Sequence, residues 1–380
     1  MSYLDTLLQG VEVEWKALGE VTNVLRGRRL TREQLSSDKK FPVFHGGLEP
    51  LGYYEKKNRP ANSVMIINVG ASAGTVGYCD IDFWSSDGCY CIEHSKKLNN
   101  KFLYYFLIGV QHFLQSRVRK AGIPTLDAPI IEKILIPIPF AGNDEKSLKI
   151  QKEIVSILDT FTELTAELTA ELTAELTARN NQYKYYREQL FSFREGAVEW
   201  KTLEVLAQNL DSMRKPVTSG LRDAGNIPYY GASGIVDYVK DYIFDGDYLL
   251  VSEDGANLIA RNTPIAFSIS GKTWVNNHAH VLQFNTYAER RFVEYFLNSI
   301  DLSPYISGAA QPKLNQRNLN SIKIPNPSLE EKVKIVSILD KFDTLTTSLS
   351  EGLPKEIELR KKQYEYYRDL LLTFPKNNIK

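Results

Sequence analysis

The sequence predicts an α+β fold in which two globular α/β domains are separated by two long antiparallel helices that form a coiled coil. Three observations support this prediction. Sequence segments of the first half return in the same order in the second half. Each copy holds strand-like stretches and an amphipathic helix, followed by a much longer helical segment. The helical segments match in length, whereas the globular segments diverge, which indicates a pseudo-twofold internal repeat.

The repeat is visible as matched segments about 180 to 190 residues apart. Two matches in the helical region share one offset of 181 residues, so neither copy has gained or lost a net residue there. The offset drifts in the globular region. The matches are VEWKALGEV (13–21) with VEWKTLEVL (198–206), ILIPIP (134–139) with IKIPNP (322–327), IVSILD (154–159) with IVSILD (335–340), and QYKYYR (182–187) with QYEYYR (363–368).

The globular copies each combine short strands with one amphipathic helix. We expect strands at Val64–Asn68 and Tyr248–Val251, bounded by Gly, Asn and Asp turns. The amphipathic helices are expected near 98–119 and 288–300. A short strand that ends in Pro-x-Pro is expected before each long helix. The prolines disfavour helix there and separate the globular segment from the long helix. The predicted segments are 1–146 (first globular domain), 147–195 (central long helix), 196–327 (second globular domain) and 328–380 (distal helix).

The long helices are expected at 147–192 and 328–373. In the first, Glu-Leu-Thr-Ala occurs four times between Glu163 and Ala178. A period of four residues turns an α-helix by about 400°, so the four leucines form a stripe that drifts by about 40° per repeat. Such a stripe needs a partner helix, and the second copy supplies one. Gly352-Leu353-Pro354 predicts a break in the distal helix.

Composition limits the possible classes of protein. The formal net charge is zero, so charge alone does not indicate nucleic-acid binding. The three cysteines (Cys79, Cys89 and Cys91) imply no disulfide framework. The longest apolar stretch is Phe102–Val110, far short of a membrane span, and no signal peptide is visible. We therefore expect a cytoplasmic protein without a membrane partner.

Catalytic and metal motifs are weak. The Asn/Asp-Pro-Pro-Tyr/Phe motif of adenine methyltransferases is absent. Gly271-Lys-Thr273 resembles the end of a phosphate loop, but Ala266 stands where the earlier glycine is required. His278-x-His280 lacks acidic or cysteine partners at ligand spacing, so a structural or DNA-facing role is expected and no metal site. Cys89-x-Cys91 is interpreted as a pair of buried strand cysteines.

Basic residues are the candidates for DNA contact, because Arg and Lys bind phosphates and read guanine, although any of them could be ordinary surface charge. The candidates in the first domain are Arg26, Arg28, Arg29, Arg117, Arg119 and Lys120, and those in the second are Lys215, Arg261, Lys272, Lys313 and Arg317. Candidates for packing and a subunit interface on the helices are Leu164, Leu168, Leu172, Leu176, Tyr183, Tyr186, Tyr364 and Tyr367.

The order of motifs resembles the specificity subunits of type I restriction–modification systems. Pro-x-Pro, IVSILD, a TAEL-type run and QYxYYR follow one another as in that family. KTWVNNHAH at 272–280 and GAAQPKLN at 308–315 are similar to family motifs as well. Two departures lie in the first copy: the extra residues 141–147 after Pro-x-Pro, and WSSDGCY at 84–90 in place of the matched motif.

The resemblance implies a non-catalytic subunit with two target-recognition domains, each reading one half of a bipartite DNA sequence. It implies that the helical regions set the spacer and bind two modification subunits, and that restriction subunits join that complex. S-adenosylmethionine, ATP and Mg are then expected on the partner subunits, and no cofactor in this chain.

Two other classes of function stay open from the residues alone. One is a coiled-coil scaffold with two globular heads and no DNA role. The other is a self-contained restriction or modification enzyme, against which the missing methyltransferase and nuclease motifs argue.

Overall fold

The computed structural model describes residues 7–8, 12–194, 196–308, 311–348 and 350–375. It divides the chain into two compact units. The first comprises Met1–Glu171 with Ile357–Lys380, and the second comprises Leu172–Glu356. Each unit therefore combines one globular segment with parts of both long helical regions, whereas the four predicted segments follow chain order. The long helix α6 (Asp144–Leu190) and helix α12 (Leu353–Leu372) contribute to both units.

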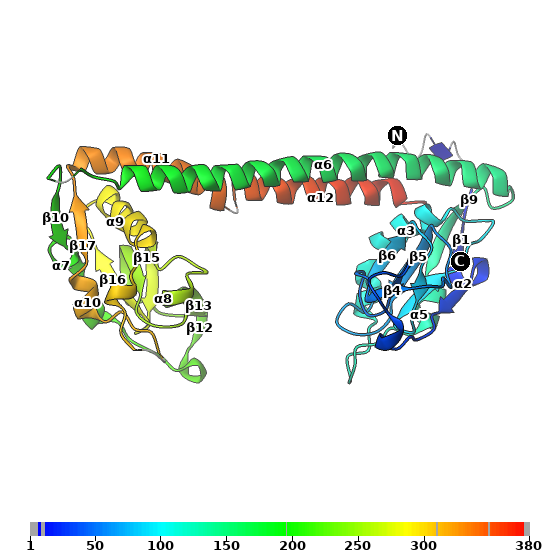
Figure 1. Ribbon diagram of the computed structural model, residues 1–380, viewed down its shortest axis with the longest axis horizontal. Coiled ribbons are helices and arrows are strands. Elements are labelled where there is room, and N and C mark those ends of the chain that lie inside the picture. Colours follow the sequence, from blue (N-terminus) through cyan, green and yellow to red (C-terminus); the bar gives the residue numbers. More distant parts are fainter. Residues whose placement is uncertain (1–6, 9–11, 195, 309–310, 349, 376–380) are drawn as a thin grey trace. The chain divides into compact units, whose positions relative to one another are not determined.

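The globular part of the first unit is built from short strands and helices (Figure 1). Its strands form sheets in the orders β2-β8-β5-β6, β4-β3-β7 and β1-β9. The strands are β1 (Val13–Ala17), β2 (Val24–Arg26), β3 (Phe41–Phe44), β4 (Gly52–Tyr54), β5 (Ser63–Ile67), β6 (Val76–Cys79), β7 (Trp84–Ser85), β8 (Cys89–Ile92) and β9 (Leu135–Pro139); the helices are α2 (Leu18–Val21), η1 (Arg32–Gln34), α3 (Asn100–Gly109), α4 (Gln111–Ser116) and α5 (Ala128–Glu132).

The second unit has sheets in the orders β11-β16-β14-β15-β12-β13 and β10-β17. Its strands are β10 (Glu199–Thr202), β11 (Gln208–Asn209), β12 (Ala224–Gly231), β13 (Gly234–Val239), β14 (Phe244–Ser252), β15 (Ala266–Val275), β16 (Ala279–Gln283) and β17 (Lys323–Asn326). Its helices are α7 (Leu203–Leu206), η2 (Asp211–Met213), η3 (Ser219–Leu221), α8 (Asn257–Ala260), α9 (Tyr287–Ser299), η4 (Ser303–Tyr305), α10 (Gln316–Asn320) and α11 (Leu329–Thr347).

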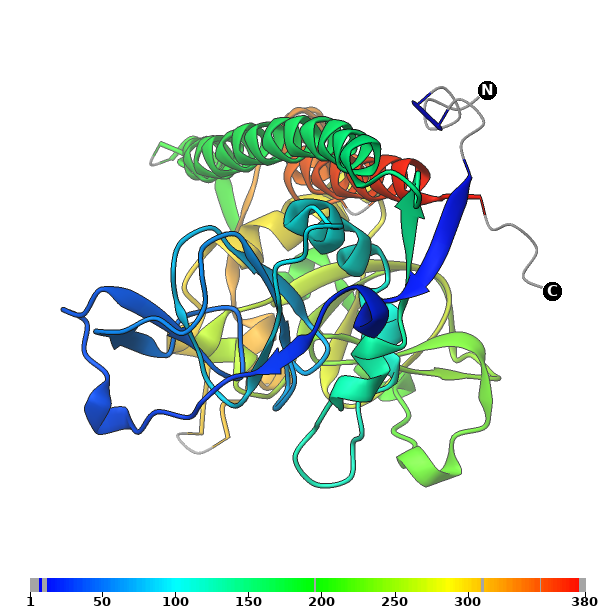
Figure 2. The ribbon, with the colours of Figure 1, turned by 90° about the vertical axis from the view of Figure 1, so that its right-hand side faces the viewer.

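The repeat in sequence is also a repeat in topology. The order β2-β8-β5-β6 of the first unit returns as β11-β16-β14-β15 in the second. A parallel pair joins Val43 to Trp84 in the first unit and Tyr229 to Trp274 in the second. The Pro-x-Pro strands pair antiparallel with the VEWK strands, as β9 with β1 and β17 with β10. Figure 2 shows β1 beside β9. The predicted internal repeat is therefore confirmed.

The long helices pack antiparallel within each unit. In the first, the Phe161 ring of α6 lies 5.9 Å from the Tyr367 ring of α12, and Thr162 Oγ1 donates to the Tyr364 hydroxyl over 3.0 Å. In the second, the ring of Tyr183 stacks on that of Phe342 in α11, with centroids 5.9 Å apart. The predicted break is confirmed, because α11 ends at Thr347 and α12 begins at Leu353. Gly352 adopts a φ of 86°, which a side chain would strain.

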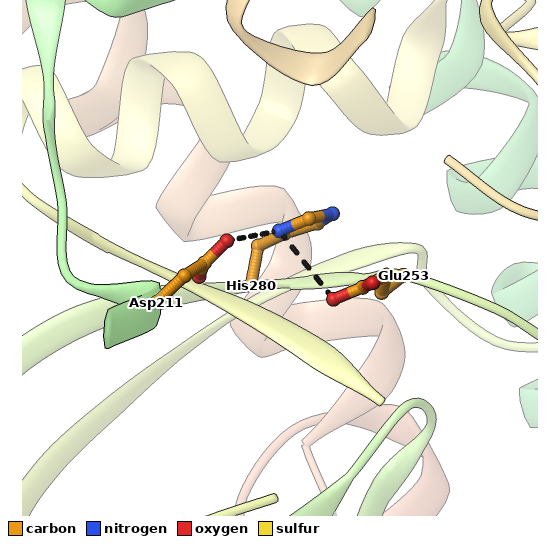
Figure 3. A group of neighbouring side chains, drawn as sticks. All are labelled: Asp211, Glu253 and His280. Carbon is orange, nitrogen blue, oxygen red and sulfur yellow. Dashed lines mark hydrogen bonds and ion pairs between the residues drawn. The ribbon is translucent and has the colours of Figure 1, made fainter. Parts of the chain in front are cut away.

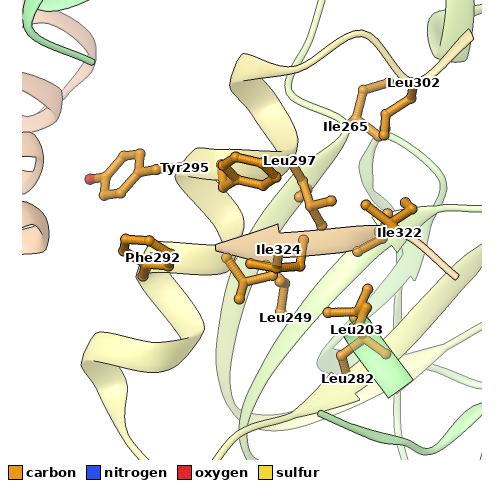
Figure 4. Packing of buried hydrophobic residues seen from close by; sticks show 14 of the residues in the cluster. Leu203, Leu249, Ile265, Leu282, Phe292, Tyr295, Leu297, Leu302, Ile322 and Ile324 are labelled. Carbon is orange, nitrogen blue, oxygen red and sulfur yellow. The ribbon is translucent and has the colours of Figure 1, made fainter. Parts of the chain in front are cut away.

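The IVSILD motif attaches each globular domain to its helices. In the second unit its buried residues Ile335, Val336 and Leu339 join the same core cluster as Phe292 of α9. Figure 4 shows α9 packing Phe292 and Leu297 over the strands of that domain. Burying three aliphatic side chains stabilises the attachment by roughly 5–9 kcal/mol at about 1.5–3 kcal/mol each. In the first unit the equivalent residues Ile154, Val155 and Leu158 are buried with Phe102.

The tail of the chain completes the first core. Leu371, Leu372 and Phe374 are buried there, and the Phe374 ring meets the Phe102 ring edge-on at 6.0 Å. The Trp15 indole N–H donates to the carbonyl of Pro375 over 3.1 Å. In the second unit the segment after α6 has the same role, with Phe191 edge-on to Phe292 at 5.2 Å. The described tail thus lies beside the first strand, as a quasi-cyclic repeat requires.

Two local expectations need correction. The helix expected near 98–119 is split into α3 and α4, because Gly109 and the β-branched Val110 interrupt it. Helix α6 begins at Asp144, so part of the extra segment forms its first turn, capped by the side chain of Asn143.

Several other expectations hold. The segment 64–68 lies largely in β5, 248–251 in β14, and 288–300 in α9 but for its last residue. Gly271-Lys272-Thr273 lies within strand β15, which no phosphate loop could do. Cys89 and Cys91 are buried in β8 as free cysteines. Among the described residues, each helix is too short or too polar to traverse a lipid bilayer.

The packed tail gives a test of this fold. We predict that Phe374→Ala lowers the free energy of unfolding of the first unit by about 3–5 kcal/mol, because it leaves a cavity against Phe102. Denaturant unfolding combined with hydrogen exchange in α3 measures the change. The exposed Tyr366 is the control, and Tyr366→Ala should stay within about 0.5 kcal/mol. Equal stability of both variants would contradict the packing.

Candidate functional site

Each globular domain contains its own loop junction, and the two junctions are built in the same way. The first junction comprises residues 68–74, 86–90 and 119–126, and the second comprises residues 253–258, 276–280, 307–308 and 311–314. At the centre of the first junction, the Gly70 amide donates to the Pro124 carbonyl over 2.9 Å. The Gly255 amide donates to the Pro312 carbonyl over 3.2 Å. Both glycines have positive φ, 88° and 105°, a conformation that other residues rarely adopt. The backbone is thus folded in the same way in both copies.

Further backbone contacts repeat in the same positions. In each copy a leucine amide in the loop before α5 or α10 donates to the carbonyl of the residue that begins the glycine turn, Asn68 or Glu253. The amide of that same residue donates to the carbonyl of the residue just before β8 or β16. In both copies a tryptophan indole N–H also donates to a backbone carbonyl in the segment that follows the second strand of the domain. The matched bonds are Leu126 N to Asn68 O (2.9 Å) with Leu314 N to Glu253 O (2.7 Å), Asn68 N to Gly88 O (3.2 Å) with Glu253 N to His278 O (2.9 Å), and Trp84 Nε1 to Arg28 O (2.7 Å) with Trp274 Nε1 to Lys215 O (2.6 Å).

The side chains on this common backbone differ between the copies. At five matched positions the first junction has uncharged residues, whereas the second has charged or titratable ones. The equivalent pairs are Asn68 with Glu253, Val69 with Asp254, Gly88 with His278, Tyr90 with His280, and Thr125 with Lys313. A shared backbone with different side chains is the arrangement that two binding sites of one design but different specificity need.

An ionic network lies beneath the second junction (Figure 3). The fully buried His280 places Nδ1 2.6 Å from Asp211 Oδ2 and 3.8 Å from Glu253 Oε2. Its Nε2 lies 2.7 Å from the Leu314 carbonyl oxygen. Both ring nitrogens of His280 therefore face oxygen atoms. Asp211 reaches the network from η2, Glu253 from the end of β14 and His280 from β16.

Arg214 and Lys313 complete the network. The Arg214 guanidinium contacts Glu253 Oε2 at 2.5 Å and Asp211 Oδ2 at 3.4 Å, and the Lys313 ammonium contacts Glu253 Oε1 at 3.0 Å. Burial raises the pKa of Asp211, but the hydrogen bond and charge of His280 outweigh it and lower the pKa. Burial likewise raises the pKa of Glu253, and its bonds to Arg214 and Lys313 lower it overall. Both carboxylates are thereby held ionised.

The expectation that the histidines lack acidic partners was wrong for both, because His278 contacts Asp254 and His280 contacts Asp211. The ligand atoms of Asp211, Glu253 and His280 lie within 4.8 Å of one another, a grouping that could hold a metal ion. Sequence spacing missed it because Asp211 is 69 residues away. The arginine and lysine already neutralise the two carboxylates, so the donor set suits an ion network better than a cation site. That this chain holds no metal stays a prediction.

The predicted basic residues of the first domain fall on two exposed segments. Arg117 lies just before the loop junction, Arg119 and Lys120 lie within it, and Arg119 forms an antiparallel bridge with Thr125. The Arg117 guanidinium lies 5.0 Å from the centroid of the Phe113 ring. Arg26 is the last residue of β2, and Arg28 and Arg29 follow it; the Arg28 amide donates to the Ser85 carbonyl.

In the second domain the structure separates the candidates. Lys313 belongs to the junction, Arg317 lies exposed on the following helix α10, and Lys215 is exposed next to Arg214. Lys272 lies on β15 with its ammonium 4.6 Å from the centroid of the Tyr242 ring, away from the junction turn. Arg261 is half-buried beside a cavity of about 380 Å³ that Tyr183 also lines, so the structure does not bring it to the junction.

The predicted interface residues are divided between packing and surface. Tyr183, Tyr186, Tyr364 and Tyr367 contact the partner helix within their own units. Leu164 is half-exposed, and Leu168, Leu172 and Leu176 are partly covered. The tyrosines therefore pack the two helices against each other, and the Leu164 side chain is a half-exposed apolar group on the helix surface. Whether any of these residues contacts another subunit stays a prediction, as does DNA contact by the basic residues.

Sequence reasoning did not find Asp211, Arg214, Glu253 or Asp254. The repeat itself held a signal for two of them, because aligning the copies places Glu253 and Asp254 opposite the neutral Asn68 and Val69. Acids that replace neutral residues at matched, turn-forming positions mark a place where the copies differ in chemistry. Asp211 and Arg214 carried no such signal, since their partners are distant in sequence.

A duplicated backbone design with two sets of side chains is suited to a protein that recognises two different targets. A family model described as "Type I restriction modification DNA specificity domain" matches residues 10–178 and again 198–359. The chain belongs to this family. The two matches correspond to the two copies, so each is one such domain with its adjoining helix.

Relatives match over nearly the whole chain. The chain is 35% identical to the Escherichia coli "Type I restriction enzyme EcoR124I/EcoR124II specificity subunit", covering 99% of this chain and 98% of that protein. It is 33% identical to the E. coli "Type I restriction enzyme EcoprrI specificity subunit", covering 92% of each. A solved chain from work on complex assembly and conformational transition of the type I R-M system has a TM-score of 0.63 at 15% identity, covering 95% of this chain and 97% of that chain. That likeness supports the fold.

The lowered pKa of Asp211 gives a pH-dependent prediction. A carboxyl whose folded pKa lies below its unfolded value of about 4 stabilises the fold above that pH, and the contribution is lost as the pH falls through the folded pKa. We predict that Asp211→Asn destabilises the second unit by about 3–5 kcal/mol at pH 7, because His280 and Arg214 lose a buried partner. The difference should shrink below pH 4.

Denaturant unfolding at pH 3 to 7, with hydrogen exchange in β14 and β16, measures this dependence. Asp223→Asn is the matched control, since Asp223 is exposed. Parallel stability curves for the wild type and Asp211→Asn across this range would show that the network does not hold the carboxylate ionised.

Proposed function

We propose that the chain is the DNA-binding specificity subunit of a type I restriction–modification complex and carries no catalysis of its own. Each globular domain reads one half of an asymmetric bipartite duplex target. The observation that carries this proposal is the loop junction, whose backbone bonds repeat while the side chains differ. The same backbone would let both junctions approach DNA in the same orientation. Their different side chains would then read different bases.

The partners follow from the family. The relatives are named as specificity subunits, and one solved neighbour comes from work on assembly of the type I R-M system. We propose that two modification subunits dock on the helical regions and that restriction subunits join them in the cytoplasm. S-adenosylmethionine would be bound by the modification subunits, and ATP and Mg would serve the restriction subunits. Half-exposed apolar side chains such as Leu164 offer contact surface for that assembly.

Mapping of adenine methylation tests this function. A host with its modification subunits and this chain should methylate one asymmetric bipartite motif, and the same host without the chain should not. The two half-sites should differ because the two junctions differ. A host that methylates the same motif in both cases would contradict the proposal. Methylation by this chain alone would instead favour a self-contained enzyme, and absence of duplex binding with the modification subunits would favour a scaffold.

The ELTA run provides a test of spacer length. Removing one four-residue repeat turns α6 by about 40° and shortens it by about 6 Å. One base pair of B-DNA turns by about 34–36° and rises by about 3.4 Å. We therefore predict that deletion of Glu171–Ala174 shortens the methylated spacer by about one base pair and leaves both half-sites unchanged.

A length-preserving variant is the control for this deletion. Glu171→Gln changes the charge of the same repeat without changing the rotation or the rise of α6, so its spacer should equal that of the wild type. Methylation motifs of the three chains, read in the same host, give the comparison. A deletion variant that still methylates sites with the original spacer would contradict the role of the helix.

A further inference from the structure

Two residues of the second junction combine a hydrogen-bond donor and an acceptor at one exposed place. Asp254 and Lys313 are antiparallel bridge partners, so their Cα atoms are neighbours. The Lys313 side chain is 51% exposed and that of Asp254 is 33% exposed. His278 Nδ1 lies 2.9 Å from Asp254 Oδ2. Two neighbouring backbone positions of this surface therefore carry a lysine ammonium, which can donate, and a carboxylate, which can accept.

Both side chains are held from below. The Lys313 ammonium binds Glu253, whose other oxygen binds Arg214. Arg214 also contacts Asp211, which holds the buried His280. Since Glu253 is nearly buried and bound on two sides, it fixes the lysine head in one region. A lysine that is already oriented loses less conformational entropy on binding than a free one.

The charges around Lys313 fit a base edge better than a phosphate. Glu253 holds a carboxylate oxygen 3.0 Å from the ammonium, Asp254 is the backbone bridge partner of Lys313, and carboxylates repel the phosphate backbone. A base edge in the major groove offers both donors and acceptors. Guanine presents the acceptors O6 and N7, which suit lysine, and its partner cytosine presents the N4 amino donor, which suits a carboxylate.

We propose that Lys313 and Asp254 are specificity-determining residues of the second domain and together read one G·C base pair in the major groove. This inference rests on the proposed function and adds the residues and the base pair. Lys313 donates to guanine O6 or N7, and Asp254 accepts from cytosine N4. Glu253, Arg214, Asp211 and His280 are positioning residues that hold Lys313 and the turn in place.

The first junction has different residues at the two positions that correspond to Asp254 and Lys313. Val69 and Thr125 occupy the equivalent bridge positions, and neither can carry a charge. The Thr125 hydroxyl donates to the Ile123 carbonyl within its own loop. The first domain therefore cannot read guanine with this pair of positions. Substitutions of Lys313 and Asp254 should change the second half-site and leave the first half-site unchanged.

Methylation mapping with the full chain and its modification subunits tests the inference. Lys313→Gln should make one G·C position of the second half-site degenerate, with discrimination there falling about tenfold to a hundredfold. Lys313→Arg should keep guanine, because arginine donates to the same two acceptors. Asp254→Asn should relax the same base pair. Lys323→Gln is the control, since Lys323 is an exposed lysine on β17 of the same domain, and its motif should equal that of the wild type.

Binding measured at several salt concentrations separates base reading from phosphate contact. If Lys313→Gln weakens binding equally for every sequence and lowers the salt slope by about one, Lys313 contacts a phosphate and the inference is wrong. An unchanged motif in both Lys313→Gln and Asp254→Asn would also overturn it. A wild-type chain that directs no sequence-specific methylation would instead refute the proposed function.

Discussion

The orientation of each globular domain on its helices depends on one repeated contact, a tyrosine hydroxyl that donates to the aspartate ending the IVSILD motif. Tyr105 donates to Asp159 over 2.6 Å, and Tyr295 donates to Asp340 over 2.7 Å. Burial and the neighbouring carboxylate raise the pKa of both tyrosines, so the hydroxyl keeps the proton that it donates. This hydrogen bond is directional, whereas the hydrophobic contacts of the buried aliphatic residues beside it are not. Together they fix the angle at which a domain leaves its helix.

This attachment explains why the copies agree in some places and differ in others. Residues that fix the domain on the helices, such as the IVSILD motif, must serve the same geometry twice and are shared. Junction residues that face solvent have no such constraint, and Thr125 and Lys313 differ freely on one backbone. The buried network around His280 supports only the second junction, because the equivalent Tyr90 needs no charged partner.

Much of the fold could be predicted from the sequence, because repeat offsets and periodicity report on backbone. The break at Gly352 and the Pro-x-Pro strands followed from residues with fixed backbone preferences. The site could be predicted less well. Lys313 was found as a basic residue within the GAAQPKLN motif, but its partner Glu253 was not, since pairing across loops depends on tertiary structure. Arg261 shows the opposite error, a basic residue with suitable chemistry that folding leaves half-buried elsewhere.

The central claim is that a common helical attachment carries two separable recognition domains. A chimera tests it most directly, in which residues 18–134 replace 203–322, because Leu18 matches Leu203 and Ile134 matches Ile322 in the two repeats. With the modification subunits, this chimera should methylate an inverted repeat of the first half-site at the wild-type spacer, as a pseudo-twofold arrangement requires. A chimera that methylates two unlike half-sites, or a direct repeat, would contradict the account.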